Sequence, residues 1–96
     1  MNKEKLANAV RCLKALSHPI RLGILCALRD GEKPVLQLVE ELGTTQSNLS
    51  QHLASMRERD ILTTDKRANQ VFYAVRDSRM FKLLDVLKAV YCSDAD

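Results

Sequence analysis

The chain has 96 residues, of which 46% are hydrophobic and 28% are charged, with a formal net charge of +3. This size and apolar content fit a single small globular domain over residues 1–96 and argue against a disordered chain. No apolar run approaches the ~20 residues that a bilayer span needs, and the charged start MNKEKLANAV lacks the apolar core of a signal peptide. We therefore expect a cytoplasmic protein without membrane contacts, whose mild positive charge permits a polyanionic partner but does not demonstrate one.

The first half of the chain predicts three helices joined by short turns. Apolar residues recur every three or four positions in the first helix, at Leu6, Val10, Leu13 and Leu16. In the second helix, Ser17 is the expected cap and Pro19 suits the first turn, where its missing N–H would be unpaired anyway. That helix ends near Gly31, and a third, short helix runs from Pro34 to Leu42 and stops at Gly43.

The next helix has one apolar stripe and an uncharged polar face. Thr44 or Thr45 can cap it, and Leu49, Leu53 and Met56 form the expected buried stripe. No charged side chain occurs in residues 44–56, whereas a helix face turned only to water usually carries Lys and Glu. Two helices joined by the tight turn at Gly43 make a helix-turn-helix pattern, with this helix as the one that reads DNA.

The last third of the chain predicts a β-hairpin and a final helix. The segments ILTTD and QVFYAV are rich in β-branched and aromatic residues, and residues 66–69 between them form a basic tip. Ser78 is the expected cap of a helix over residues 79 to about 92, and the last residues should be frayed. The expected fold class is mainly α with a small β-hairpin wing, that is, a winged helix-turn-helix.

The candidate DNA contacts lie on the polar helix face and at the hairpin tip. The amides of Asn48 and Gln51 can bond adenine in the major groove, while Ser47, Ser50 and the helix N-terminus can hold phosphate. Double-stranded operator DNA is thus the expected partner, although any small helical domain could carry a solvated polar face. The full candidate set is Thr45, Gln46, Ser47, Asn48, Ser50, Gln51, His52, Lys66, Arg67 and Asn69.

Three segments resemble one known family over nearly the whole chain. LKALSHPIRLGILCAL, LVEELGTTQSNLSQHLASMRERDIL and the hairpin ending VFYAV are similar to the ArsR/SmtB family of bacterial winged-helix repressors. The resemblance implies a homodimer formed by the first and last helices, an inverted-repeat operator, and a sensory site that releases DNA when occupied. The family commonly has Gly at the position of Asp60, where a left-handed residue is expected and Asp is tolerated.

Many members of that family sense metals, so a zinc- or arsenite-sensing repressor is the alternative function. The arsenic and cadmium sensors carry a Cys-x-Cys pair where this chain has Pro34 and Leu36, which cannot ligate. The zinc and nickel type uses Asp and His on the last helix, and here that helix has Asp85 but no histidine. We expect His18 and His52 to be capping, structural or DNA-facing residues, and we assign no metal site and no cofactor.

The cysteines indicate a different signal. Cys26 in RLGILCAL and Cys92 in LKAVYC match the BigR, SqrR and HlyU-like repressors of the family. In that subgroup the two cysteines form an intrasubunit dithiol, and the resemblance implies that low-molecular-weight persulfides or oxidants link Cys26 to Cys92 here. A direct disulfide needs Cα atoms within ~7 Å, whereas extra sulfur atoms span a wider gap, and the sequence does not give that distance. A lone Cys26 could equally fill space in the core.

Two further points bound the chemistry. Cys12 on the first helix has no counterpart in the subgroup, so it is an interface residue, a lesser thiol or an intermolecular partner. A small dithiol oxidoreductase is disfavoured because the chain has no Cys-x-x-Cys, no glycine-rich phosphate loop and no Ser/His/Asp set. We therefore expect a protein that is not an enzyme and has no catalytic residues.

Overall fold

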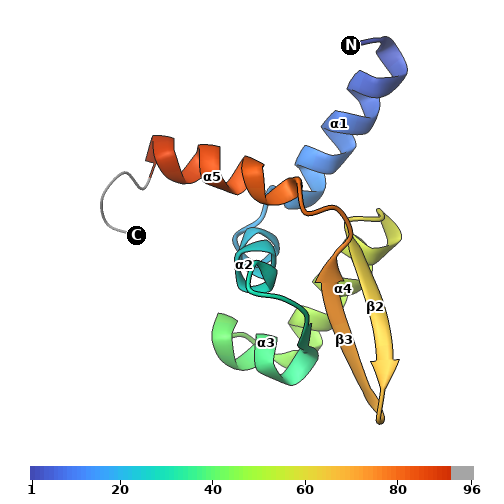
Figure 1. Cartoon of the computed structure of the whole chain (residues 1–96), viewed down its shortest axis with the longest axis vertical. Helices are drawn as coiled ribbons and strands as arrows, with labels where there is room; N and C mark the ends of the chain where they lie inside the picture. Colours follow the sequence, from blue (N-terminus) through green and yellow to red (C-terminus); the bar gives the residue numbers. More distant parts are fainter. Residues whose placement is uncertain (92–96) are drawn as a thin grey trace.

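The computed structural model describes residues 1–91, and residues 92–96 lie outside the described part. Within it, helices dominate and a small antiparallel sheet has the strand order β1-β3-β2 (Figure 1). The elements are α1 (Lys3–Leu16), α2 (Pro19–Leu28), β1 (Lys33–Pro34), α3 (Val35–Leu42), α4 (Gln46–Glu58), β2 (Leu62–Arg67), β3 (Gln70–Val75) and α5 (Met80–Tyr91). The predicted fold class, a mainly helical chain with a hairpin wing, is confirmed.

The turn between α1 and α2 differs from the expectation in its capping residue. Ser17 closes α1, because its N–H still donates to the carbonyl of Lys14 at 3.3 Å. His18 is the residue that caps α2: its Nδ1 accepts from the N–H of Ile20 at 3.1 Å, with Pro19 in the first turn as predicted. The assignment of Ser17 as the cap was therefore wrong, and a ring nitrogen replaces the expected hydroxyl.

The helix-turn-helix follows the sequence closely. Gly43 ends α3 in the left-handed conformation (φ 64°), and the Oγ1 of Thr45 caps α4 by accepting from the N–H of Asn48 at 3.1 Å. The strand β1, which the sequence did not predict, precedes α3. It has only two residues, and its pairing of Lys33 with Tyr73 attaches the start of α3 to the sheet.

The wing is a tighter hairpin than predicted. Arg67 pairs with Gln70, so only Ala68 and Asn69 form the turn, with φ of 49° and 67°. Two successive left-handed residues are typical of the two-residue turn whose twist matches that of the strands. Consequently Lys66 and Arg67 belong to β2 and not to the turn itself.

Asp60 before the hairpin and Asp77 after it each have a special local role. Asp60 has φ 60°, which confirms the left-handed conformation expected there. Before α5, the carboxylate of Asp77 accepts from the N–H of Arg79 at 3.0 Å and also binds its guanidinium. This hydrogen-bonded guanidinium lowers the pKa of Asp77 to about 2. Asp77, and not the expected Ser78, thus holds the start of the last helix, which begins at Met80.

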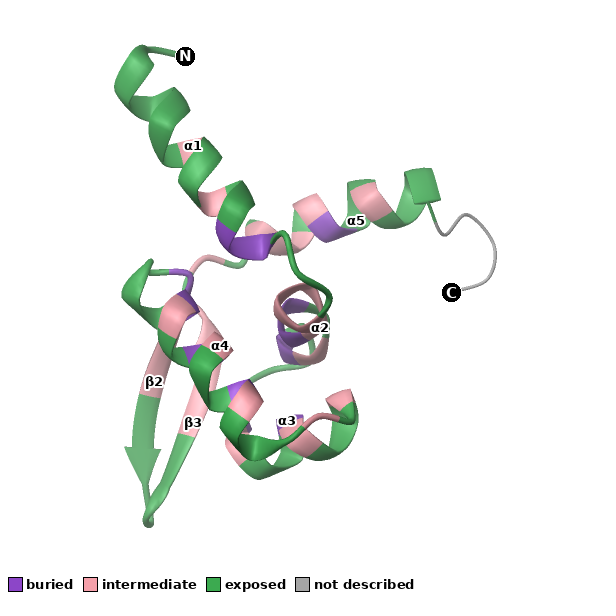
Figure 2. Cartoon of the chain, turned by 180° about the vertical axis from the view of Figure 1, so that it is seen from behind, coloured by how far each residue is buried: buried purple, intermediate pink, exposed green. Residues whose placement is uncertain are grey.

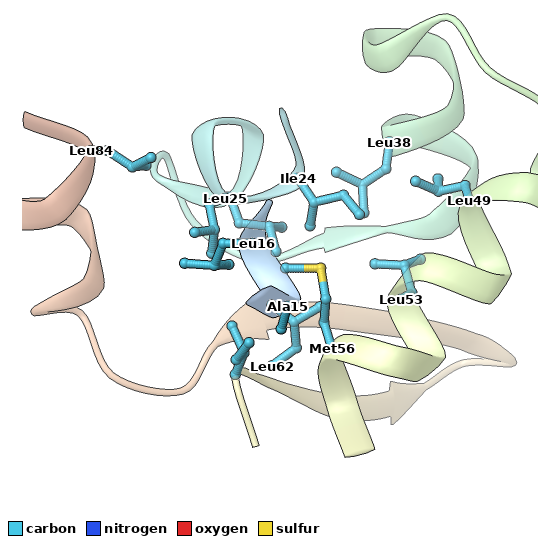
Figure 3. Packing of buried hydrophobic residues seen from close by; sticks show 12 residues of the cluster. Ala15, Leu16, Ile24, Leu25, Leu38, Leu49, Leu53, Met56, Leu62 and Leu84 are labelled. Carbon is cyan, nitrogen blue, oxygen red and sulfur yellow. The ribbon is translucent and has the colours of Figure 1, made fainter. Parts of the chain in front are cut away.

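The core lies between α2, α3, α4 and the base of the wing. Figure 3 shows the inner stripe of α4 facing side chains from α2 and α3, and the predicted stripe residues Leu49, Leu53 and Met56 are 0% exposed. In contrast, α1 and α5 extend outward from this body (Figures 1 and 2). Buried residues of α1 are confined to Ala15 and Leu16 at its end, and α5 buries Leu84. The reading helix α4 therefore packs against a complete core, whereas most residues of α1 and α5 are exposed to solvent.

Candidate DNA-binding surface and sensory groove

The outward face of α4 carries most of the predicted DNA contacts. Because Leu49 and Leu53 anchor the helix to the core, residues on the opposite face are exposed, as the green parts of α4 show in Figure 2. No acidic residue lies in the first turn of α4, so nothing there repels phosphate. The exposed candidates on and before this helix are Thr45, Gln46, Ser47, Ser50 and Gln51.

Asn48 is half-buried and serves the helix start. Its amide Nδ2 donates to the Oγ1 of Thr44 at 2.9 Å, and its backbone N–H donates to Thr45. These bonds hold the first turn of α4 in shape. The amide of Gln51, one turn further on and exposed, makes no such bond to any of residues 1–91 and is the better placed of the two to reach a base edge.

His52 packs against α2. The Nε of Arg21 donates to the Nδ1 of His52 at 3.0 Å, and the ring centroids of His18 and His52 are 4.4 Å apart. Burial lowers the pKa of His52, and electrostatic interactions with His18 and Arg21 lower it further. Since the Nη1 of Arg21 also donates to the carbonyl of Ala15 at 3.1 Å, one guanidinium joins the end of α1, α2 and the reading helix. The ring of His52 thus has a structural partner, and its DNA contact stays a prediction.

The wing presents its two basic residues differently. Lys66 is exposed. Arg67 forms ion pairs with Glu32 and with Asp65, whose Oδ2 lies 3.1 Å from its Nε, and its guanidinium stacks 4.2 Å above the ring of Phe72. To reach DNA, Arg67 would have to leave these partners, so Lys66 is the more available cation of the wing.

A recess of about 350 Å³ lies between the wing and the starts of α3 and α4. Gln46 and Ser50 of α4 and Asn69 of the wing turn line it together. The fold thus brings predicted residues from two distant segments to one surface. Gln70, the first residue of β3, also lines the recess. The sequence did not single it out because its position depends on the hairpin register.

A second, mainly apolar groove separates α2 from α5. It encloses about 680 Å³, and its lining is Leu22, Cys26, Arg29, Leu84, Leu87, Lys88 and Tyr91. Cys26 is exposed, so it does not fill the core. Arg29 forms an ion pair with Asp85 of α5 at 2.6 Å and donates to the carbonyl of Phe81 at 3.2 Å, which ties the two walls of the groove together.

The second predicted thiol, Cys92, lies outside the described residues. Tyr91, which directly precedes it in the chain, lines the same groove as Cys26. Cys12 is half-buried on α1, where burial raises the pKa of its thiol, and it lines a different groove together with Arg11 and Arg59. Of the two cysteines in residues 1–91, only Cys26 lies between α2 and α5.

The described residues offer no metal centre. Residues 1–91 contain no group of three or more His, Cys, Asp or Glu side chains that could hold an ion. His18 and His52 are close to each other, and the Nδ1 of each accepts a hydrogen bond, from Ile20 in His18 and from Arg21 in His52. In the same part of the chain, none of the helices has the length and apolar character to cross a membrane.

The helix-turn-helix, the uncharged stretch of α4 over residues 46–56 and the hairpin beside it define a winged-helix DNA-binding protein. Residues 18–64 match the family described as "Bacterial regulatory protein, arsR family". The chain belongs to this family of DNA-binding transcriptional regulators, which confirms the assignment made from the sequence.

Relatives with curated names extend over most of the chain. It is 38% identical to the "Biofilm growth-associated repressor" of Xylella fastidiosa over 94% of this chain and 80% of that protein. It is 41% identical to the "Transcriptional activator HlyU" of Vibrio cholerae over 90% of this chain and 80% of that protein. These relatives are transcriptional regulators and not enzymes.

Solved structures give the same result. Reduced HlyU from Vibrio cholerae is similar with a TM-score of 0.84 and 38% identity, covering 95% of this chain and 96% of that one. The transcriptional repressor BigR from Xylella fastidiosa has a TM-score of 0.84 and 36% identity, covering 98% of this chain and 100% of that one. The resemblance to the BigR- and HlyU-like subgroup, stated from the sequence, is thereby confirmed.

Proposed function

We propose that the chain acts as a homodimeric repressor that binds an inverted-repeat operator and is released when persulfides or oxidants link Cys26 to Cys92. The observation that carries this proposal is the α2–α5 groove, which holds the exposed Cys26 and extends to Tyr91. Cys92 follows Tyr91 directly in the chain.

The exposed apolar faces of α1 and α5 support the dimer. Leu6, Val10 and Leu13 of α1 are 53%, 41% and 55% exposed. On α5, Val86 and Val90 are 60% and 63% exposed. Each side chain of this type gains ~1.5–3 kcal/mol on full burial, so covering both faces with a second copy is favourable. A two-fold dimer of this kind would present its two reading helices about one DNA turn apart, which an inverted repeat matches.

The sensing reaction balances with a persulfide as the oxidant. The Cys26 thiolate attacks the outer sulfur of RSSH, the S–S bond of the donor breaks, and RS⁻ leaves with the electron pair. Cys26 then carries –S–SH. The Cys92 thiolate attacks the sulfur attached to Cys26, a disulfide forms, and HS⁻ leaves, so the sulfane sulfur is reduced while two thiols are oxidised.

The link would act on DNA binding through the packing of α2. It joins the end of α5 to α2 within one subunit, and α2 contacts the reading helix through Arg21 and His52. Allosteric couplings are typically ~1–3 kcal/mol, which weakens operator affinity by about one to two decades. Occupancy of an operator depends on how much more tightly it is bound than random DNA. A loss of this size in operator affinity lowers that ratio, so the protein leaves the operator.

The test measures operator affinity across candidate signals. An operator duplex is selected from random sequences, and its Kd is measured with reduced protein and after treatment with an organic persulfide, peroxide, zinc or arsenite. We expect weaker binding after persulfide treatment, no change in the Cys92→Ser variant, and a normal response in the matched control Cys12→Ser. Loss of binding only with zinc or arsenite would establish the metal-sensing alternative, and an unchanged Kd in every arm would contradict both.

A further inference from the structure

The α2–α5 groove is larger than a thiol switch alone requires. A volume of about 680 Å³ is typical of a site for an organic small molecule, whereas the attacked sulfur occupies a single position beside Cys26. Leu22 and Cys26 are four residues apart on α2, so they lie on one helix face and share the groove wall. The groove around the Cys26 thiol thus has room to contact the rest of a ligand as well as its reacting sulfur.

The lining combines an apolar surface with positive charge. Four of its side chains are apolar or aromatic, and among residues 1–91 its charged members are Arg29 and Lys88. Asp85 pairs with Arg29 at 2.6 Å and partly neutralises it, and Lys88 is near enough to lower the pKa of Asp85 alongside that hydrogen bond. Asp30 also interacts with Arg29, so carboxylates offset the charge of Arg29, and Lys88 is the cation left at the rim of the apolar groove within residues 1–91.

The groove and the expected dimer contact use different faces of α5. Leu84, Leu87, Lys88 and Tyr91 recur every three or four residues and line the groove. Val86 and Val90 lie about a third of a turn away around the helix and do not line it. A second copy packed on the Val86–Val90 face therefore leaves the groove accessible.

We infer that this groove binds the organic body of the sulfur donor, and that the preferred donor is a small persulfide with an apolar body and a carboxylate. The carboxylate pairs with Lys88, the body covers Leu87 and Tyr91, and the terminal sulfur meets Cys26. This inference rests on the proposed function, whose reaction it leaves unchanged. It excludes inorganic polysulfide as the best donor, since that ion has no body to fill the groove.

The first test measures binding without any sulfur chemistry. Reduced full-length protein is treated with iodoacetamide, and alkylation of Cys26 is followed by peptide mass spectrometry, with Cys12 as the internal reference. Saturating 4-phenylbutanoate is expected to slow alkylation of Cys26 by about threefold or more, and the neutral 4-phenylbutanamide to slow it less, because an exposed ion pair contributes up to ~1 kcal/mol. Equal protection by the two compounds, or protection by neither, overturns the inference.

Two charge reversals on α5 locate the effect. Lys88→Glu is expected to abolish the advantage of the carboxylate over the amide, and Lys88→Gln to reduce it. Lys82→Glu, on an exposed residue of the same helix that does not line the groove, is the matched control and should keep the full advantage. A loss of equal size in both reversed variants would indicate a general charge effect and would overturn the site.

The second test separates this inference from the proposed function. The persulfide of a carboxylated arylalkyl thiol, its methyl ester and inorganic polysulfide are compared at equal concentration by the rate of Cys26 persulfidation and by DNA release. We expect the carboxylate donor to react fastest by about threefold or more, and this preference to disappear at high salt. Equal rates with DNA release would refute donor selection and leave the sensor intact. A clear preference without DNA release would refute the sensor and leave the groove intact.

Discussion

The reading helix α4 and the last helix α5 are both amphipathic, yet they complete their packing to different degrees. Three apolar residues of α4, Leu49, Leu53 and Met56, are fully buried. On α5 only Leu84 is buried, while Val90 and Tyr91 are 63% and 79% exposed. An apolar stripe that one chain covers serves stability, and a stripe that one chain leaves open requires a second molecule.

The polar faces of the two helices differ as well. The outer face of α4 has amides and hydroxyls that can bond base edges. The outer face of α5 has lysines and an aspartate that interact with Arg29 or solvent. In the proposed function, DNA and the signal are recognised by helices of different surface chemistry, with α2 packed between them.

The largest effect should come from the core under α4. Leu53→Ala removes a fully buried side chain, so we expect the free energy of unfolding to fall by about 2–5 kcal/mol. Urea denaturation followed by circular dichroism measures this value. The control Leu36→Ala, at a residue 63% exposed on α3, should stay within about 0.5 kcal/mol, and equal losses in the two variants would contradict the burial described for α4.

The second effect tests whether the exposed apolar face of α5 packs against a second copy of the chain. Placing a charge in an apolar contact by Val86→Asp or Val90→Asp should weaken dimerisation by about 30-fold or more, as for other central interface residues. Sedimentation velocity over a concentration series gives the dissociation constant. Lys88→Gln, on the groove side of the same helix, is the control, and an unchanged dimer in the aspartate variants would place the interface elsewhere.

The third effect concerns the polar face of α4. Gln51→Ala should cost about 1–3 kcal/mol of operator affinity and relax the preference at one base pair, because it removes a bidentate amide. Lys66→Gln in the wing should instead weaken all sequences alike and reduce the slope of log K against log salt by about one. Fluorescence anisotropy with the operator and with substituted duplexes measures both, and an identical pattern in the two variants would argue against base reading by Gln51.

The smallest effect probes the contact between α4 and α2 through pH. The folded chain holds the pKa of His52 below its ordinary value of 6.5, because burial, His18 and Arg21 oppose its positive charge. The unfolded chain therefore binds the proton more tightly. The contribution of neutral His52 to the free energy of unfolding is fully present above about pH 6.5, and it is lost as the pH falls from there toward the lowered pKa. His52→Gln should show a shallower loss of thermal stability between pH 7.5 and 5.5. A steeper loss in that variant would contradict the contact with Arg21.

Much of the fold and part of the site could be predicted from local patterns. The apolar spacing of α1 and α4, the glycine at position 43 and the left-handed Asp60 each depend on neighbours within a few residues, and each agrees with the structure. The caps predicted at Ser17 and Ser78 were wrong. Several polar side chains near each helix start can accept from the same N–H, and the exact path of the backbone decides which of them does.

Long-range pairings account for the other misses. Arg67 carries a charge suited to DNA, but its partner Glu32 lies 35 residues away, and the sequence does not show that the two meet. The strand β1 is too short for any periodicity. Lys88 and Arg29 come from different helices, and nothing in either segment marks them as the rim of one groove.

By itself, the sequence determined the helix-turn-helix, the uncharged face of its second helix, and the family to which the chain belongs, because these depend on residue types at short and regular spacing. Only the tertiary structure decided that Cys26 is exposed in an apolar groove closed by α5, that His52 turns toward Arg21, and that Arg67 is paired within the chain. The physical reason is that exposure and ion pairing are properties of packed helices and strands, which bring together side chains that the order of the residues keeps far apart.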